Sequence, residues 1–530
     1  MKKFIKKIKI HNFKKFDDLT IEFDESLNIF IGDNEAGKST ILTAIDLVLS
    51  GSRNKVENLG IDKLFNIDVV KNFLASDKSF DNLPKLYVEL YLGQEDEKGA
   101  SIYGEKFRGK YNSEDVNSDG LLLELTPNDA LSDEVAEILN QEDDNFPFEY
   151  YSIHFNLFSG EAYTGYSLRN ELKHLILDSS QISNDAATKH YIKRLFESNT
   201  DTTQTSKLKN EYRKQKEIFT ENNFASLNEE IGDYSFAIRS NSKSNLTSDL
   251  TIREDDIDIT NKGKGRQCFI KTDFALRKSH DNLDIVLLEE PENHLSHTYM
   301  QGLIQRINES QAKQLFIATH SNLISARLDL RKAILLNSNT NQKAILNDLP
   351  SDTAKFFMKA PNSNILQFIL SQKVILVEGD AEFILMEAMY EKVTNEKLSN
   401  SGVHVISVGG TSFKRYLDIA KLLEIKTAVI RDNDRDYSNN CVERYNDYSD
   451  ANNIEIFSDK DDLIYTFEVA IYNENEDICE SIWSVGRRSL SVLEYMLKNK
   501  ADCAFELLDT QSETLEVPDY IKEAIKWIKD

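Results

Sequence analysis

The sequence is poor in the residues that cross-link or interrupt a chain, and these shortages limit the kind of protein it can be. Its 530 residues include four cysteines and seven prolines. The cysteines lack CxxC spacing, so they indicate neither a zinc cluster nor a disulfide framework. No stretch approaches the roughly 20 apolar residues of a membrane span, and the Lys-rich start lacks the apolar core of a signal peptide. We therefore expect a cytoplasmic protein with no membrane partner.

Positive charge is also in short supply. The chain has 63 Lys and Arg residues against 89 Asp and Glu residues, a formal net charge of −26. This excludes a generally polycationic nucleic-acid binder, because a negative surface repels phosphates and diffuse attraction cannot supply affinity. Any nucleic acid must then be bound locally. Two basic runs are candidates for phosphate contact or for solvated faces: Lys2, Lys3, Lys6, Lys7, Lys9, Lys14 and Lys15, and Lys207, Lys209, Arg213, Lys214 and Lys216.

A phosphate-binding loop is present near the start of the chain. Residues 32–40 read GDNEAGKST, which satisfies G-x-x-x-x-G-K-[ST] between an apolar strand pattern and the helical pattern ILTAIDLVLS. The backbone of such a loop surrounds phosphates, Lys38 adds a point charge and Ser39 offers a hydroxyl to magnesium. We predict an ATP site here, formed by Gly32, Asn34, Gly37, Lys38, Ser39 and Thr40.

The second half of this nucleotide site is predicted near residue 290. DIVLLEEPENHLSH is an apolar strand pattern that ends in two carboxylates. Glu289 would hold the magnesium ion, directly or through water, and Glu290 would polarise the attacking water. The next apolar strand pattern, QLFIATHSNLIS, places His320 near the γ-phosphate as a sensor.

A separate acidic constellation follows about 340 residues after the phosphate loop. KVILVEGDAEFILMEAMYEKV, VHVISVGG, TSFKRYLDIAKLLE and KTAVIRDND read as strand, helix, strand, helix and strand. In a parallel sheet the carboxyl ends of the strands share one edge, so Glu378, Asp432 and Asp434 can converge. Converged carboxylates repel one another unless a cation is bound, and Mg²⁺ or Mn²⁺ with phosphodiester chemistry suits such a cluster.

Both constellations resemble known families. GDNEAGKST, LLEEPENHL and ATHS, in this order, resemble the ABC-type ATPase heads of the RecF, SMC-like and OLD-nuclease group. In that group two heads sandwich the triphosphate, and a Gly-rich signature from the opposite protomer completes the site. The corresponding segment here is NKGKGRQ, Asn261–Gln267, which departs from the usual LSGGQ-like signature. An aspartate of the family is also replaced by Glu289.

The acidic half resembles the Toprim domain of topoisomerases, primases and OLD-family nucleases, through E-G-x-x-E and D-x-D at strand ends. The resemblance implies that Glu382 supports the cluster, directly at a second metal or behind the ligands. OLD-type nucleases add an acidic residue and a lysine after D-x-D. Glu468 in DLIYTFEVAI and Lys500 in LKNKADCAFEL are at the matching places, with a surface glutamate and a solvated lysine as the alternatives.

The resemblance predicts an α/β protein of four segments. These are the first half of an ABC ATPase head over 1–167, a helical insertion for dimerisation over 168–245, the second half of the head over 246–368 and a Toprim nuclease domain over 369–530. A helical decoration without a partner is the alternative for the insertion. Within the OLD family, GGTSF before the D-x-D motif and the total length resemble the nuclease subunits of Gabija antiphage systems.

That family implies an ATP-regulated, Mg²⁺- or Mn²⁺-dependent DNA endonuclease, a homodimer or dimer of dimers, and a UvrD-like helicase partner. The sign of any ATP effect stays open. A rival hypothesis is an ATPase sensor or scaffold that recognises a phage component, with a Toprim domain that cleaves tRNA or is inactive. A topoisomerase lacks room here for strand-passage domains, and an SMC-like repair ATPase needs a longer coiled coil.

Overall fold

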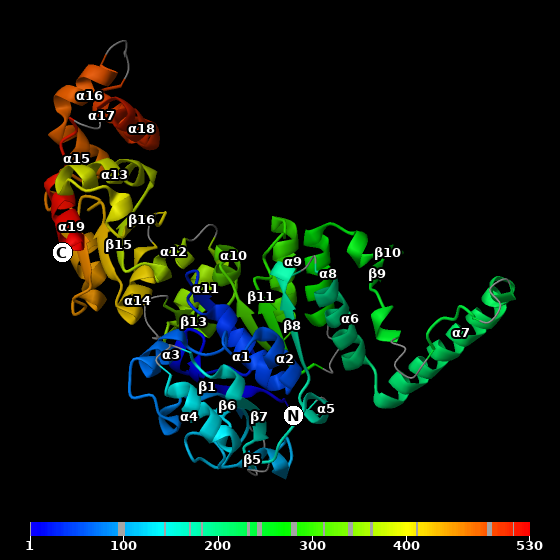
Figure 1. Ribbon diagram of the computed structural model, residues 1–530. Coiled ribbons are helices and arrows are strands. Elements are labelled where there is room, and N and C mark those ends of the chain that lie inside the picture. The colour runs from blue at the N-terminus through cyan, green and yellow to red at the C-terminus, as the bar shows by residue number, and fades with distance from the viewer. Residues whose placement is uncertain are drawn as a thin grey trace. The chain divides into compact units, whose positions relative to one another are not determined.

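The computed structural model describes residues 2–530 except 94–100, 142–144, 169–170, 182–183, 230–233, 241–245, 277–282, 311–312, 338–342, 361–363, 410–411, 485–489 and 512–513. The chain divides into two compact units (Figure 1). Unit 1 consists of residues 1–320 and 334–343, and unit 2 consists of residues 321–333 and 344–530. Each has its own hydrophobic core.

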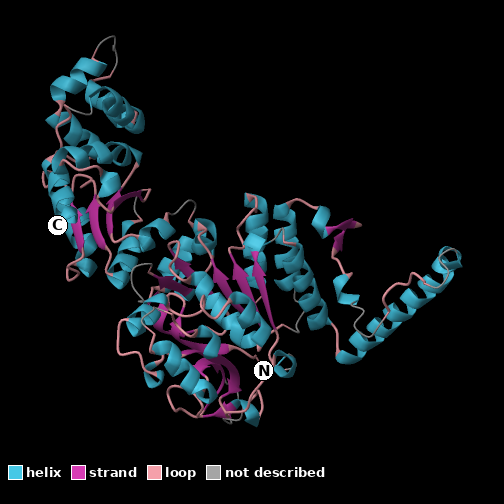
Figure 2. Ribbon diagram, in the orientation of Figure 1, coloured by secondary structure: helices cyan, strands magenta, loops and turns pink. Residues whose placement is uncertain are grey.

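An antiparallel sheet forms one layer of unit 1 (Figure 2). Its strand order is β2-β1-β4-β6-β5, and β7 also pairs with β6. Apolar and polar residues alternate along the first strand, so Ile8 and Ile10 are buried while Lys9 between them is partly exposed. The strands are β1 (Ile5–Phe13), β2 (Phe16–Glu22), β4 (Leu86–Leu92), β5 (Arg108–Gly109), β6 (Ser118–Pro127) and β7 (Tyr151–Leu157).

A second sheet has the order β14-β13-β3-β12-β11-β8. Its central strands are short and almost wholly buried, as expected for parallel strands covered on both faces. The strands β3, β12, β11 and β8 run parallel to one another. The bounds are β3 (Leu27–Gly32), β8 (His174–Asp178), β11 (Ile285–Glu289), β12 (Gln314–Ala318), β13 (Ala333–Leu336) and β14 (Lys343–Ile345).

One strand of this sheet lies where the sequence indicates a helical insertion. Residues 174–178 form β8 and pair in register with β11, with His174 opposite Ile285 and Asp178 opposite Glu289. The helical insertion of the described chain therefore starts after β8, at α6 (Asp185–Asn199). The next helix, α7 (Thr202–Glu229), has 28 residues and no buried side chain, and Figure 1 shows it as one long helix.

The other helices of unit 1 pack on its core, and one of them follows the phosphate loop. Helix α1 (Lys38–Ser50) follows the phosphate loop, and its buried face includes Ile41, Leu42 and Ile45. Helices α8 and α9 contact each other. The bounds of the remaining helices are α2 (Arg53–Leu59), α3 (Ile67–Leu74), α4 (Ser132–Leu139), α5 (Gly165–Leu168), α8 (Lys264–Leu276) and α9 (His297–Glu309); a short hairpin joins β9 (Arg253–Glu254) to β10 (Ile257–Asp258).

A buried ionic cluster ties α1 to the start of the insertion. Asp46 on α1 is 4% exposed and forms ion pairs with Lys55 and Arg194, the latter at 3.4 Å between Oδ1 and the guanidinium Nη1. The imidazole Nε2 of His174 lies 3.1 Å from the same Oδ1. Burial alone would raise the pKa of Asp46, but these cations and the His174 hydrogen bond lower it. Helix α6, which carries Arg194, is thereby fixed to the nucleotide-loop helix.

Unit 2 contains a four-stranded parallel sheet of order β16-β15-β17-β18. Strands and helices alternate in the order that the sequence predicts from Lys373 to Ile430. The elements are β15 (Lys373–Val377), α13 (Asp380–Thr394), β16 (Val403–Ser407), α14 (Phe413–Leu423), β17 (Lys426–Ile430) and β18 (Ile454–Phe457). The predicted α/β fold class is confirmed in both units.

Further helices complete unit 2. Helix α13 contacts α18 and α19, and α19 also contacts β17 and β18. They bury the apolar faces of the sheet and of α13 in one core. The helices are α10 (Asn322–Arg327), α11 (Ser351–Lys359), α12 (Ile365–Leu370), α15 (Phe467–Glu474), α16 (Glu476–Trp483), α17 (Val492–Lys498), α18 (Lys500–Gln511) and α19 (Asp519–Lys529). In the described part of the chain, no helix combines the length and the apolar character needed to cross a bilayer.

Candidate active sites

The phosphate loop connects the end of β3 to the start of α1. Gly37 has φ of 98°, in the left-handed region, and a Cβ atom there would lie 2.3 Å from Cζ of Phe16. Only glycine fits this position without displacing a buried ring. No side chain caps the amino terminus of α1. Its first N–H groups are therefore available to an anion such as a nucleotide phosphate.

Lys38 lies inside the loop. Its Nζ donates hydrogen bonds to the carbonyl oxygens of Gly32, at 2.7 Å, and Asp33, at 2.8 Å. Burial lowers the pKa of Lys38, and nearby carboxylates including Glu290 oppose this effect. The ammonium group is thus held by backbone oxygens at the place where a phosphate would meet it. Asn34 and Ser39 are exposed at the loop, and Thr40 is half-buried on α1.

The sheet brings the other predicted nucleotide-site residues to the same edge. Glu289 ends β11, its carboxylate accepts a hydrogen bond from Ser39, and burial raises its pKa. Glu290 follows with φ of 44°. Its Oε1 lies 3.2 Å from Nε2 of His320, whose Nδ1 lies 3.4 Å from Nζ of Lys38. The five side chains that the sequence assigns to magnesium, water and phosphate therefore form two groups at this edge, Ser39 with Glu289 and Glu290 with His320 and Lys38.

The structure adds residues that the sequence motifs do not single out. Glu292 accepts hydrogen bonds from the hydroxyl of Thr319, at 2.7 Å, and from the backbone N–H of His320, at 2.8 Å, which fixes the position of that histidine. Asp178, at the end of β8, adds repulsion that raises the pKa of Glu289. Lys14 partly offsets it. Lys14 belongs to a basic run visible in the sequence, whereas Asp178 reaches the site only through strand register.

The signature-like segment 261–267 lies at the start of α8. A Cβ atom on Gly265 would lie 2.2 Å from the carbonyl oxygen of His294, so this turn packs directly on the loop after Glu290. Lys262 and Arg266 both form ion pairs with Glu254, Lys262 at 2.7 Å. Two of the three cations of this segment are therefore paired with Glu254, and the third, Lys264, is exposed.

A second site is built at the carboxyl edge of the sheet in unit 2. Glu378 follows β15 and Asp432 follows β17, and these two strands are hydrogen-bonded neighbours. The backbone N–H of Asp432 is near enough to the carboxylate of Glu378 to lower its pKa. Two residues that are 54 positions apart in the sequence thus lie at the ends of neighbouring strands, as parallel-strand geometry predicts.

Three helices extend this site. Oδ1 of Asp432 accepts a hydrogen bond from the backbone N–H of Phe467 at 2.8 Å, at the start of α15. The next residue, Glu468, is 3% exposed, and its Oε2 lies 2.9 Å from Nζ of Lys500 at the start of α18. Glu382, on α13, is 6% exposed. The structure therefore brings Glu378, Glu382, Asp432, Glu468 and Lys500 together.

The carboxyl groups of this cluster resist ionisation. Burial first, and then repulsion from Glu382, Glu378 and Glu468, raises the pKa of Asp432 to about 8. Burial, with repulsion from Glu468 and Glu378, raises the pKa of Glu382 to about 7. The pKa of Glu378 is also raised by burial. Lys500 opposes all three shifts but does not cancel them.

Asp434 occupies a different position from the other acids. Its side chain is exposed, and Oδ2 lies 3.4 Å from the guanidinium Nη2 of Arg431, which is buried. Its charge contributes to the raised pKa of Glu378. Asp434 is thus connected to the cluster on the Glu378 side, with Arg431 as its direct partner.

A divalent cation fits this set of donors. Oε2 of Glu378 is buried and has no hydrogen-bond partner in the described structure, which is costly unless a further group meets it. Buried carboxylates that repel one another form an oxygen-rich environment suited to Mg²⁺ or Mn²⁺. No three of these carboxylates have oxygens that all lie within 4.8 Å of one another. Mg²⁺ keeps several waters, which can span such gaps.

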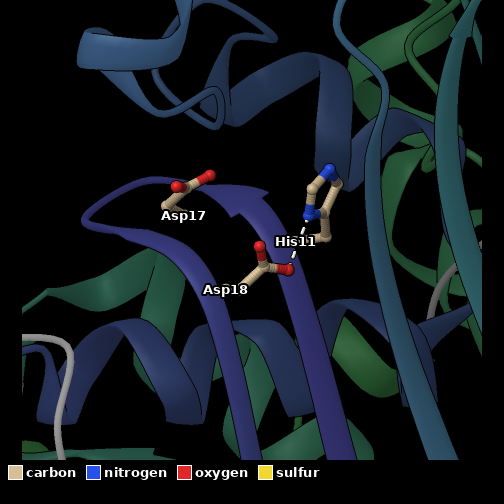
Figure 3. Close-up of side chains that lie close together, drawn as sticks. All are labelled: His11, Asp17 and Asp18. Atoms are coloured by element: carbon tan, nitrogen blue, oxygen red, sulfur yellow. Dashed lines mark hydrogen bonds and ion pairs between the residues drawn. The ribbon is translucent and has the colours of Figure 1, made fainter.

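The tighter oxygen and nitrogen group in the described chain lies elsewhere, at the β1–β2 hairpin. Figure 3 shows His11, Asp17 and Asp18, whose ligand atoms lie within 4.8 Å of one another. Both aspartates are exposed, and Nδ1 of His11 lies 2.7 Å from Oδ1 of Asp18. The second ring nitrogen lies 2.9 Å from the amide of Asn12. With both ring nitrogens engaged, this group is explained as a surface hydrogen-bond cluster.

The fold and the two sites define a nucleotide-binding ATPase followed by a Toprim domain. A family model described as "AAA ATPase domain" matches residues 1–324, and one described as "Overcoming lysogenization defect protein-like, TOPRIM domain" matches residues 369–434. The chain belongs to this AAA ATPase domain family and, with its Toprim domain, is an OLD-family protein of the ATPase-plus-nuclease type.

Curated relatives agree with this assignment. The chain is 24% identical to Endonuclease GajA of Bacillus cereus (strain VD045) over 81% of this chain and 74% of that protein. It is 25% identical to Old nuclease of Escherichia phage P2 over 28% of each chain. Among solved structures, an SMC head bound to the C-winged helix domain of ScpA is 15% identical, covers 64% of this chain and 97% of its own, and has a TM-score of 0.37.

Proposed function

We propose that the protein is an ATP-regulated, divalent-metal-dependent DNA endonuclease that acts in antiphage defence in the cytoplasm. The observation that carries the proposal is the convergence of acids around Asp432, which ends a strand next to that of Glu378 and accepts a hydrogen bond from the amino terminus of α15. The acids come from the ends of β15 and β17 and from two helices, α13 and α15, at one sheet edge. The similarity to Endonuclease GajA over 81% of this chain supports the same activity.

The residues of the Toprim site have distinct roles in this proposal. Glu378, Glu382 and Asp432 would hold Mg²⁺ or Mn²⁺, with Asp434 at the outer side. The bound cation would supply charge neutralisation at the phosphodiester and a lowered pKa for an attacking water. Glu468 positions Lys500 through their 2.9 Å contact. Lys500, with half of its side chain exposed, is suited to the scissile phosphate or the leaving oxygen.

The nucleotide site is proposed to regulate this activity. Lys38 and the amino terminus of α1 would bind the triphosphate, Ser39 and Glu289 would hold its magnesium ion, and Glu290 with His320 would orient water. We propose that the protein works as a homodimer or dimer of dimers formed through the ATPase heads and the α6–α7 arm, with a UvrD-like helicase as a further partner. Two linked phosphate sites on one chain make coupling testable.

The decisive experiment is cleavage of supercoiled plasmid in Mg²⁺ or Mn²⁺ by wild type, Glu378→Ala and Asp432→Ala. Loss of the cation's charge stabilisation, worth several kcal/mol, should reduce nicking by about 100-fold or more in both variants. Chelation by EDTA should abolish nicking by the wild type. Wild-type cleavage rates in both variants would reject this acidic centre.

A matched control lies on the same helix as Glu382. Glu387 is exposed on α13, so Glu387→Ala removes one acidic charge without touching the cluster and should cleave normally. Parallel reactions with tRNA test the rival function. If tRNA is cleaved while the plasmid stays intact, the protein is an RNA-cleaving enzyme and the proposed DNA endonuclease function is wrong.

A further inference from the structure

Two loops next to the acidic cluster are joined by one buried amide. Asn433, the middle residue of the D-x-D motif, is 1% exposed. Its Nδ2 donates to the carbonyl oxygens of Asp459, Asp461 and Ile464, at 3.0, 2.9 and 3.2 Å. Its Oδ1 accepts from the backbone N–H of Arg435 at 2.9 Å. Residues 433–437 and 459–466 therefore form a single rigid structure, which we call the rim.

The rim is anchored to the acidic cluster from both loops. The backbone N–H of Asp434 donates to the carbonyl oxygen of Tyr465 at 3.2 Å. Two residues after Tyr465, the N–H of Phe467 binds the carboxylate of Asp432. A group that sits on the rim consequently has a fixed position relative to Asp432.

The rim presents an arginine stacked on an aromatic ring. Arg435 is exposed, has φ of 67° in the left-handed region, and places its guanidinium carbon 4.2 Å from the ring centre of Tyr465. A bulky residue in this conformation is uncommon and is held only where the surroundings impose it. The exposed guanidinium therefore lies over one face of the Tyr465 ring.

Among the residues that the structure describes, Arg435 forms no ion pair, although its loop is rich in aspartates. The neighbouring aspartates instead accept hydrogen bonds from backbone N–H groups within the rim or directly after it. The pairs are Asp459 with Asp461, Asp461 with Leu463, Asp462 with Tyr437 and Asp436 with Asn439.

The rim also carries an exposed apolar side chain. Leu463 is 79% exposed, at the turn that Asp461 holds in place. An arginine, an aromatic ring and an exposed leucine on one rigid edge match the groups that contact phosphates and unstacked bases in protein–nucleic acid complexes. In a chain with a net charge of −26, such contacts must be local.

We propose that the rim binds an unpaired segment of the DNA strand that is cut at the acidic cluster. Arg435 binds a phosphate next to the scissile one, the Arg435–Tyr465 stack receives a base, and Leu463 packs on the neighbouring base. This inference rests on the proposed nuclease function and extends it to the form of the substrate. Unpaired bases are required because the stack and Leu463 need base faces that a duplex keeps covered.

Binding of a labelled single-stranded DNA oligonucleotide to the full chain, in Ca²⁺ so that cleavage does not intervene, tests the rim. Arg435→Ala and Tyr465→Ala should each weaken binding by about tenfold. Arg435→Ala should also reduce the slope of log K against log salt by about 0.7, the loss of one phosphate contact on a single strand. Tyr465→Phe keeps the ring and should bind like wild type.

The control is Lys526→Ala, which removes the same charge from an exposed position on α19. It should change neither the affinity nor the salt slope. A 2-aminopurine base in the oligonucleotide provides a readout of stacking: its fluorescence should be quenched by wild type and recover with Tyr465→Ala. Fluorescence unchanged by that variant would overturn the stacking contact.

The outcomes separate this inference from the proposed function. If Arg435→Ala and Tyr465→Ala keep the affinity and the salt slope of the wild type, the rim does not bind DNA, even if the plasmid is cut. Rim-dependent binding of the oligonucleotide by a protein that cuts no plasmid would support the rim and reject the endonuclease. Rim-dependent binding of an RNA oligonucleotide alone would overturn DNA as the occupant.

Discussion

At the scale of single residues, the Toprim site is defined by carboxyl groups that hold protons when no cation is bound. The pKa of Asp432 is raised to about 8 and that of Glu382 to about 7. Both values lie above those of the same groups in an unfolded chain, about 4. The folded, metal-free protein therefore binds more protons than the unfolded chain between about pH 4 and pH 8, and its stability falls as pH rises through this window.

This protonation predicts the pH dependence of metal binding. A divalent cation must displace the protons on Asp432 and Glu382, so the affinity for Mn²⁺ should rise between pH 6 and pH 8 and binding should release protons. Titration calorimetry in buffers of different ionisation enthalpy measures both quantities. Asp432→Asn should lower the affinity and reduce the proton release. Affinity that is independent of pH over this range would contradict the protonated cluster.

The residue scale also shows where prediction from sequence ends. Glu378, Asp432 and Lys38 were predictable because each belongs to a motif that follows an apolar strand pattern. Asn433 reads as a mere spacer between two aspartates, yet its amide binds three carbonyl oxygens of a loop about 28 residues away. Those partners depend on how β17 and β18 align, which no local pattern specifies.

At the scale of secondary-structure elements, the alternation in unit 2 was predictable and one strand of unit 1 was not. The β-α-β-α-β pattern from Lys373 to Ile430 has long apolar runs separated by clear helical periodicity. The segment HLILD of β8 is only five residues long and stands between polar and helical stretches. It pairs with β11, 111 residues later, and this long-range pairing places Asp178 opposite Glu289 at the nucleotide site.

The buried ionic cluster around Asp46, which joins α1 to α6, leads to a prediction about stability. Asp46→Ala removes a carboxylate that is 4% exposed and leaves Lys55, His174 and Arg194 without it. Breaking a buried ionic cluster in this way should destabilise unit 1 by about 3 kcal/mol. Denaturant unfolding followed by fluorescence measures this change. The exposed Asp17→Ala, on the β1–β2 hairpin, is the control and should change stability by less than about 0.5 kcal/mol.

The buried cluster around Asp46 makes stability depend on pH in the opposite direction from the carboxyl groups of the Toprim site. Burial lowers the pKa of His174 to about 4, below its unfolded value of about 6.5. The unfolded chain then binds more protons between these values, so this histidine's contribution to stability is lost as pH falls through them. A destabilisation by Asp46→Ala no greater than that of Asp17→Ala would contradict the structural role of this cluster.

At the scale of the whole molecule, the question is whether the nucleotide site governs the Toprim site. Lys38 is held by two backbone oxygens of the phosphate loop and is ready to meet a phosphate. Lys38→Ala should abolish ATP binding in a filter or fluorescence assay. Plasmid cleavage by this variant should then be the same with and without ATP, whichever direction ATP drives the wild type.

A control for this prediction lies on α3. Lys71 is exposed there, and Lys71→Ala should preserve both ATP binding and the response of cleavage to ATP. Cleavage by the wild type that is indifferent to ATP, with ATP bound, would show that the two sites work independently. A response to ATP that survives Lys38→Ala would instead place the regulating nucleotide outside the phosphate loop.

The buried amide of Asn433 has a wider consequence for how such an enzyme works. Because the Asn433 side chain joins both loops when the protein folds, the loops lose their conformational entropy before a substrate binds. The substrate then binds to a preorganised surface, and the free energy of binding is not reduced by the cost of ordering the loops. The residue between the two aspartates of the motif would thus be as costly to replace as its charged neighbours, although it carries no charge itself.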